Sequence, residues 1–117
     1  MGPTKPPTKA QARRLGIITR EIGCVACRLK VDEYRAAQAH HIIEGGKRLG
    51  HDETIPLCPW HHVGKDDIAP SVALARLGPS LALDKPRFVA QFGSEKELLE
   101  ITNAYVTLWE RGIRWAM

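Results

Sequence analysis

Aromatic residues are scarce in this chain: Phe, Trp and Tyr together make up only 6% of its 117 residues. A chain of this length forms a single domain, and with so few aromatic side chains its core is modest, so a bound metal would help to stabilise it. The sequence also lacks any run of the roughly 18 to 20 apolar residues needed to cross a bilayer. No charged stretch followed by an apolar one opens the chain. We therefore expect a soluble, intracellular protein that makes no contact with a membrane.

Cysteine is nearly absent as well, with only three in the chain, an odd number that cannot pair fully into disulfides. Two lie in a Cys-x-x-Cys and the third opens a Cys-x-x-His, and this combination of three thiolates and one imidazole is typical of a closed, tetrahedral structural zinc site. A redox pair would need a strand–helix–strand context that is missing here, and thiolates buried without a metal partner would be costly. We predict a structural Zn²⁺ bound by Cys24, Cys27, Cys58 and His61.

Acidic residues are few at the start of the chain. Residues 1–30 hold seven Lys or Arg and a single acid, Glu21, whereas residues 31–70 hold four basic residues and seven acidic ones. A basic segment followed by an acid- and histidine-rich centre suggests a polyanion held beside a cation site. A solvated basic tail that only aids solubility explains the charge equally well.

Proline, glycine and capping residues divide the chain into its elements. Residues 1–7 contain three prolines and a glycine and are predicted to form a flexible basic arm. Residues 8–117 form one α+β domain with a metal core over 24–66 and a helical C-terminal part over 84–117. We predict, in order, a helix from Thr8 to about Ile22, short strands over 39–43 and 54–57 with a polar loop between them, a short helix from Pro59, a helix from Asp84 to Gly93, and a last helix from Ser94 to about Arg111.

The zinc ligands leave three nearby histidines unused. His40 and His41 are neighbours on a predicted strand, so their side chains point to opposite faces and can divide two tasks, metal binding and contact with a substrate. An ion pocket would form between His40 on the strand and His62 on the helix, with Asp66 one turn further on as a candidate third ligand. Taken singly, each would be an ordinary surface or core imidazole; together, beside a zinc core, they favour a second metal site.

These segments resemble a known family. The stretches AHHIIEGGKRLG (39–50), IPLCPWHH (55–62) and FVAQFGSEKELL (88–99) are similar to the HNH (ββα-metal) nuclease superfamily, and within it to the phage-encoded recombination-enhancement, RecA-dependent nuclease (Ref) family. The resemblance covers roughly residues 23–101. It implies a small zinc-stabilised ββα-metal core flanked by N- and C-terminal helices. It also implies a metal-dependent DNA endonuclease that acts in recombination or DNA processing, with DNA and a RecA-type recombinase filament as partners, in the cytoplasm of the host cell if a phage encodes it.

By position in the motif, the resemblance makes His40 and His62 ligands of one catalytic Mg²⁺, Mn²⁺ or Zn²⁺ and makes His41 the general base. The middle asparagine of HNH has no counterpart, and His51, Glu53 or Thr54 can orient the base in its place. The alternative is a non-catalytic zinc-containing nucleic-acid-binding or adaptor protein, in which His41 would have no task. The basic residues expected to contact nucleic acid are Arg13, Arg14, Lys47, Arg48 and Lys65.

Overall fold

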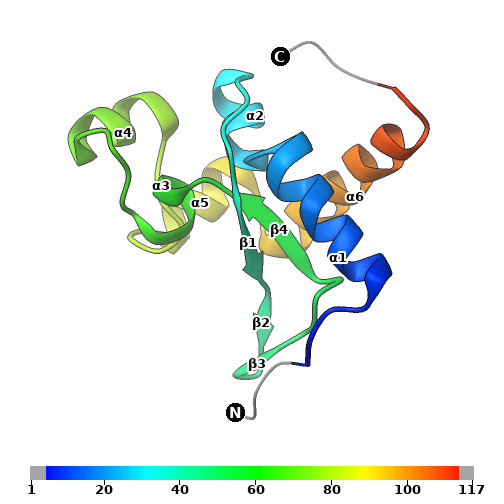
Figure 1. Cartoon of the computed structure of the whole chain (residues 1–117). Coiled ribbons are helices and arrows are strands. Elements are labelled where there is room, and N and C mark those ends of the chain that lie inside the picture. The colour runs from blue at the N-terminus through cyan, green and yellow to red at the C-terminus, as the bar shows by residue number, and fades with distance from the viewer. Residues whose placement is uncertain (1–4, 114–117) are drawn as a thin grey trace.

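Helices pack around one strand pair of this protein, and a second, smaller strand pair extends away from them (Figure 1). The structure is a computed structural model that describes residues 5–113; the first four and last four residues lie outside the description, and with them part of the predicted arm. The elements in chain order are α1 (Lys9–Gly16), the π-helical η1 (Ile17–Ile22), α2 (Val25–Val31), β1 (Gln38–His41), β2 (Ile43–Glu44), β3 (Lys47–Arg48), β4 (Thr54–Leu57), α3 (Pro59–Val63), α4 (Pro70–Leu77), α5 (Lys85–Phe92) and α6 (Glu95–Glu110).

The N-terminal helix begins and ends where the capping signals predict. The Thr8 hydroxyl accepts a hydrogen bond from the Gln11 N–H at 3.1 Å, and the Gln11 side chain accepts one from the Thr8 N–H at 2.9 Å. The helix continues through η1 and stops at Gly23, which has φ +76°. A Cβ at this glycine would lie 2.6 Å from the Arg35 carbonyl oxygen, so only glycine fits. The chain therefore turns sharply into the first cysteine knuckle.

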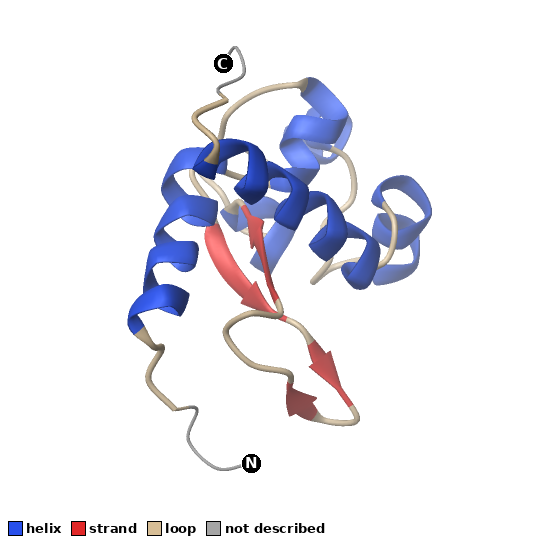
Figure 2. Cartoon of the chain, turned by 90° about the vertical axis from the view of Figure 1, so that its right-hand side faces the viewer, coloured by secondary structure: helices blue, strands red, loops and turns tan. Residues whose placement is uncertain are grey.

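Strands β1 and β4 pair antiparallel and lead into α3, which makes the predicted ββα unit (Figure 2). The register places His40 opposite Ile55 and His41 opposite Thr54. The predicted polar loop contains a second hairpin, β2–β3, which the sequence prediction missed. Its turn is Gly45-Gly46, with φ of +60° and +78°, the left-handed pair that a two-residue hairpin turn requires.

The C-terminal half is helical, as predicted, with one addition. A hydrogen bond from the Arg87 N–H to Asp84 caps α5, and a capping box of Ser94 and Glu97 opens α6. Helix α4 formed where no helix was predicted; Pro70 starts it and Gly78 ends it. None of the helices within residues 5–113 combines the length and apolar character of a membrane span.

Two apolar clusters hold these elements together. The larger one packs the three buried cysteines against β4, α3, α5 and α6, and it includes Ile55, Leu57, Phe88 and Leu98. The smaller one packs η1 against Val106 of α6. Helices, short antiparallel strands and a Cys₃His cluster confirm the predicted small α+β fold.

Candidate metal centres and histidine cluster

The two knuckles meet at the centre of the larger cluster. Their four donor atoms lie within 4.8 Å of one another, and all four residues are buried. The Sγ atoms of Cys27 and Cys58 are 3.7 Å apart, and His61 Nδ1 lies 3.3 to 3.6 Å from the three sulphurs. A tetrahedral Zn²⁺ with bonds of about 2.3 Å to sulphur and about 2.0 to 2.1 Å to nitrogen separates its ligands by about 3.8 and 3.6 Å. The predicted ligand set is therefore assembled and could hold a zinc ion.

His61 is oriented for this task from its far side. Its Nε2 donates to the Leu77 carbonyl at 2.8 Å, which leaves Nδ1 facing the sulphurs. Burial opposes a charge on this ring, but hydrogen bonds with Cys24 and Cys58 raise the pKa of His61 to about 10. Hydrogen bonds with Cys24 and Cys27 lower the pKa of Cys58, and hydrogen bonds with Cys24 and Cys58 raise the pKa of Cys27. A bound cation would stabilise the deprotonated form of all three thiols, which is the form that binds a metal.

A second histidine cluster lies at the outer end of the ββα unit. The rings of His40, from β1, and His62, from α3, meet edge to face with their centroids 5.2 Å apart. In the described part of the chain no third His, Cys, Asp or Glu donor joins them closely enough to complete a three-residue site. Two imidazoles with open positions suit a cation that also binds water or phosphate oxygens, in contrast to the closed cysteine site.

The outward nitrogens of these two rings are held by acceptors. His40 Nε2 lies 3.4 Å from Glu95 Oε2 at the start of α6, and His62 Nδ1 donates to Gln38 Oε1 at 2.7 Å. A histidine that donates one N–H to a protein acceptor keeps the other nitrogen free as a metal ligand. The free nitrogens are therefore Nδ1 of His40 and Nε2 of His62.

His41 points away from this pair, as its neighbouring position on β1 predicts, and contacts His51 instead. His41 Nε2 and His51 Nδ1 are 3.1 Å apart, and the other nitrogen of His51 donates to the Lys5 carbonyl at 2.6 Å. Of the three residues considered in place of the HNH asparagine, His51 is thus the one in hydrogen-bond contact with His41. Thr54 supports it, because its hydroxyl donates to the His51 carbonyl at 2.9 Å.

Arg14 differs from its expected role. Its guanidinium donates to the Thr54 hydroxyl at 2.6 Å, to the Thr54 carbonyl at 3.0 Å and to Asn103 at 2.8 Å, so it joins α1, β4 and α6 inside the protein. Because these bonds engage both of its terminal nitrogens, Arg14 has a structural role in the fold, and its contact with a DNA phosphate stays a prediction.

Asp66 also differs from its expected role. One of its carboxylate oxygens lies 2.5 Å from the Arg35 guanidinium, in a half-buried ion pair, and the other accepts from the Asp67 N–H. It does not gather with His40 and His62 into a three-donor group. The i, i+4 spacing fails because α3 ends at Val63 and Gly64 turns the chain with φ +76°, so Asp66 is not one helical turn beyond His62.

With this geometry in place, comparison with known families is informative. A family model described as recombination enhancement, RecA-dependent nuclease matches residues 7–107. The chain belongs to this family. The family description names a nuclease that depends on RecA and serves recombination, and the match confirms the resemblance carried by the knuckles and the histidine pair. No curated protein matches the chain.

The electrostatics around His41 and His62 favour neutral rings. Burial lowers the pKa of His41, and the charge of Arg48 lowers it further. Burial also lowers the pKa of His62, with a smaller contribution from His40. A neutral imidazole has the lone pair that metal binding or proton acceptance requires.

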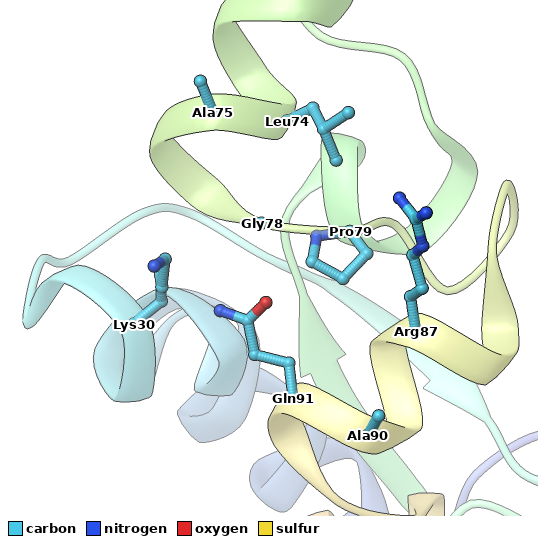
Figure 3. A pocket seen from close by; sticks show the side chains of 8 residues that line it. All are labelled: Lys30, Leu74, Ala75, Gly78, Pro79, Arg87, Ala90 and Gln91. Atoms are coloured by element: carbon cyan, nitrogen blue, oxygen red, sulfur yellow. The ribbon is translucent and has the colours of Figure 1, made fainter.

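The remaining predicted nucleic-acid contacts lie on the surface. Lys47 and Arg48 are exposed on β3, and Lys65 is exposed just after α3. Arg13 is exposed on α1 and lies 3.7 Å from Glu110. A cavity of about 450 Å³ between α2, α4 and α5 is lined by Lys30 and Arg87 and contains none of these side chains and no histidine (Figure 3).

Neither Glu95 nor Gln38 was predicted as part of the site. Glu95 is 55 residues from His40 in sequence, and its position in the first turn of α6 is explained locally by helix capping alone. Gln38 could have been found, because it lies two residues before His40 on the same face of a strand.

Proposed function

We propose that this family member is a metal-dependent DNA endonuclease of the HNH type that acts in recombination. It cleaves DNA at an open cation site that lies beside a zinc-stabilised core. In this proposal His40 and His62 hold one Mg²⁺ or Mn²⁺, His41 is the general base, and Zn²⁺ at the cysteine knuckles is structural. The observation that carries the proposal is the hydrogen bonding of the three imidazoles. Each has one nitrogen held by an acceptor outside the cluster, which leaves the other nitrogen available for chemistry.

The chemistry follows from these free nitrogens. A divalent ion between His40 and His62 supplies stabilisation of the charge that builds on the phosphate and on the leaving 3′ oxygen. His41 Nδ1 takes a proton from the attacking water, which requires the neutral ring that burial favours. The exposed cations Lys47, Arg48 and Lys65 hold flanking phosphates and so position the strand without reading its bases.

The partners in this proposal are DNA and a RecA-type filament. DNA is the substrate in this proposal because the family description names a nuclease in recombination, and exposed basic side chains on β3 and just after α3 can hold phosphates. The filament is included because the family description names RecA dependence. Phage origin follows only from the family resemblance and is part of the same proposal.

Nicking of supercoiled plasmid tests the proposal. Zinc-loaded protein is incubated with plasmid and Mn²⁺ or Mg²⁺, with and without a RecA filament on the DNA, and compared with His41→Ala. Loss of the base should lower the rate constant by about 10²- to 10⁴-fold. The matched control is Lys30→Ala, which removes an exposed side chain of α2 and should leave the rate unchanged.

Metal analysis accompanies this assay. Each protein should carry one zinc and give the same circular dichroism spectrum, so that a lost rate reflects chemistry and not folding. Equal nicking by wild type and His41→Ala would refute the role of His41. A folded wild-type protein that binds DNA and never cuts it, with or without RecA, would establish the non-catalytic zinc module instead.

A further inference from the structure

The first described residues lie against the loop that carries His51, the residue in contact with His41. Figure 1 shows the segment before α1 (blue) running beneath the connection between β3 and β4. The Lys5 carbonyl accepts a 2.6 Å hydrogen bond from His51 Nε2, and Gln11 Nε2 donates to Asp52 Oδ2 at 3.1 Å. These contacts join residues 41 to 46 positions apart in sequence. The arm and the first turn of α1 therefore contact the loop at two neighbouring residues, His51 and Asp52.

The hydrogen bond to Lys5 decides where the protons of both rings lie. A carbonyl oxygen only accepts, so His51 Nε2 must carry a proton. In a neutral ring the other nitrogen, Nδ1, is then an acceptor, and at 3.1 Å its partner is His41 Nε2. His41 Nε2 must therefore carry the second proton. His41 Nδ1 is left without one, as a general base requires.

The loop does not need the His51 ring for its own shape. Its backbone is fixed by three other hydrogen bonds: the Thr54 hydroxyl to the His51 carbonyl, the Glu53 N–H to the Gly50 carbonyl, and the Ile42 N–H to the Glu53 carbonyl. The two ring nitrogens of His51 instead join the arm to His41. This separation of tasks indicates a role for the ring in positioning His41.

We propose that His51 is a positioning residue for the reaction, and that the arm completes the site by holding His51 through the Lys5 carbonyl. This proposal rests on the proposed nuclease function and deepens it. In the step it assists, water gives a proton to His41 Nδ1 while its oxygen bonds to phosphorus and the bond from phosphorus to O3′ breaks. The leaving oxygen takes a proton from solvent, and His41 returns its own proton to solvent. Throughout, His41 Nε2–H donates to His51, which stabilises the imidazolium.

Two substitutions of His51 distinguish the role of its ring nitrogens in positioning His41 from the role of the ring's size. His51→Phe keeps a ring of similar shape and removes both nitrogens, and we expect kcat to fall on the order of 10- to 100-fold with little change in KM. His51→Asn places an amide oxygen near the position of Nδ1, so it can still accept from His41 Nε2–H. It should recover most of the lost kcat. Equal kcat for wild type and His51→Phe would overturn the proposal, as would equal losses for Phe and Asn.

The arm has its own matched pair of variants. Deletion of residues 1–6 removes the Lys5 carbonyl and should lower kcat as His51→Phe does, and combining the two changes should add no further loss. Lys5→Ala keeps the carbonyl and removes only the charge, so it should leave kcat unchanged and raise KM at most. A deletion variant with wild-type kcat would remove the arm from the proposal.

The tautomer of His41 gives a readout that does not depend on activity. Long-range ¹H–¹⁵N correlation spectra of the zinc-loaded wild type should show His41 protonated at Nε2 and His51 protonated at Nε2. In His51→Phe the His41 ring should populate both tautomers. If the wild type proves inactive, the nuclease proposal fails while these spectra still test the hydrogen-bonded relay. If the wild type is active and its His41 is protonated at Nδ1, the nuclease proposal stands, but the hydrogen-bonded order from Lys5 through His51 to His41 is wrong.

Discussion

A neutral imidazole has one proton for two nitrogens, so the nitrogen that donates to a protein acceptor determines which one is left for chemistry. In this protein the acceptor is a carbonyl for His61, an amide oxygen for His62 and a carboxylate for His40. The carboxylate differs from the other two in carrying charge. Glu95 is largely buried and also pairs with Lys85 at 3.3 Å, so it is fixed in place beside His40.

Removal of Glu95 should weaken the open cation site. Without the carboxylate, His40 loses both its orientation and part of its basicity, and we expect Glu95→Ala to reduce Mn²⁺ affinity by about 10- to 100-fold. Zinc content should stay at one per chain, because the cysteine knuckles are untouched. Titration calorimetry with Mn²⁺ measures the change.

The control for this experiment is Glu100→Ala, which removes the same charge from an exposed position on the same helix. It should bind Mn²⁺ as the wild type does. An unchanged Mn²⁺ dissociation constant in Glu95→Ala would show that Glu95 does not support the ion.

At the scale of single elements, the capping boxes explain where helices begin. Glu97 accepts a 3.0 Å hydrogen bond from the Ser94 N–H, and the Ser94 hydroxyl accepts one from the Glu97 N–H at 3.1 Å. The hydrogen bond from the Ser94 backbone N–H lowers the pKa of the Glu97 carboxyl most, and hydrogen bonding with the Ser94 side chain lowers it further. Helix α6 carries Glu95 one residue after this cap, so the box also sets the position of a site residue.

A pH dependence of stability follows from the lowered pKa of Glu97. The carboxylate is favoured in the folded state, so its contribution is present above the unfolded pKa near 4.5 and is lost as the pH falls through the lower, folded value. Gln at this position keeps the box without the charge. We expect Glu97→Gln to lose less stability than wild type between pH 5 and pH 3, by urea unfolding. Glu100→Gln, outside the box, should follow the wild type; if Glu97→Gln does so too, the charge has no role in the cap.

Local signals of this kind explain what was predictable from the sequence. The cysteine knuckles, the Thr8 cap, the Ser94 box and Pro59 in the first turn of α3 each act over three or four residues, and each was predicted correctly. The Gly45-Gly46 turn was also local, and it was missed because the flanking strands are only two residues long.

Contacts between distant segments could not be predicted in the same way. Arg14 meets Thr54 across 40 positions and Asn103 across 89, and nothing near Arg14 in sequence distinguishes it from Arg13, which stays exposed. His51 meets Lys5 across 46 positions. The tertiary fold alone decides which arginine is held inside the framework and which histidine contacts His41.

At the scale of the whole molecule, the cysteine site and the proposed cation site share one short helix. α3 starts at the zinc knuckle, places His61 in the buried cysteine site, and turns the next residue, His62, outward to the open site. The buried centre therefore sets the position of the open one. The cations Lys47, Arg48 and Lys65 are exposed, while Arg14 is bonded to Thr54 and Asn103 within the framework.

This division predicts two different effects of removing a positive charge. Lys47→Ala or Lys65→Ala should weaken DNA binding similarly for all sequences and reduce the slope of log K against log salt by about one, because each loses one phosphate contact. Arg14→Met removes a charge of the same size but should leave that slope unchanged. It should instead lower the free energy of unfolding by about 1 to 3 kcal/mol, because the buried Thr54 loses two hydrogen bonds.

Fluorescence anisotropy over a salt series and urea unfolding of the same three proteins separate these effects. The surface variants should unfold as the wild type does, and the Arg14 variant should bind DNA with the wild-type slope wherever it is folded. A lower salt slope in Arg14→Met at full stability would return Arg14 to the DNA-binding surface. An unchanged slope in both lysine variants would show that the DNA-binding surface does not include β3 or the residues after α3. The proposed course of the DNA strand past His41 would then be wrong as well.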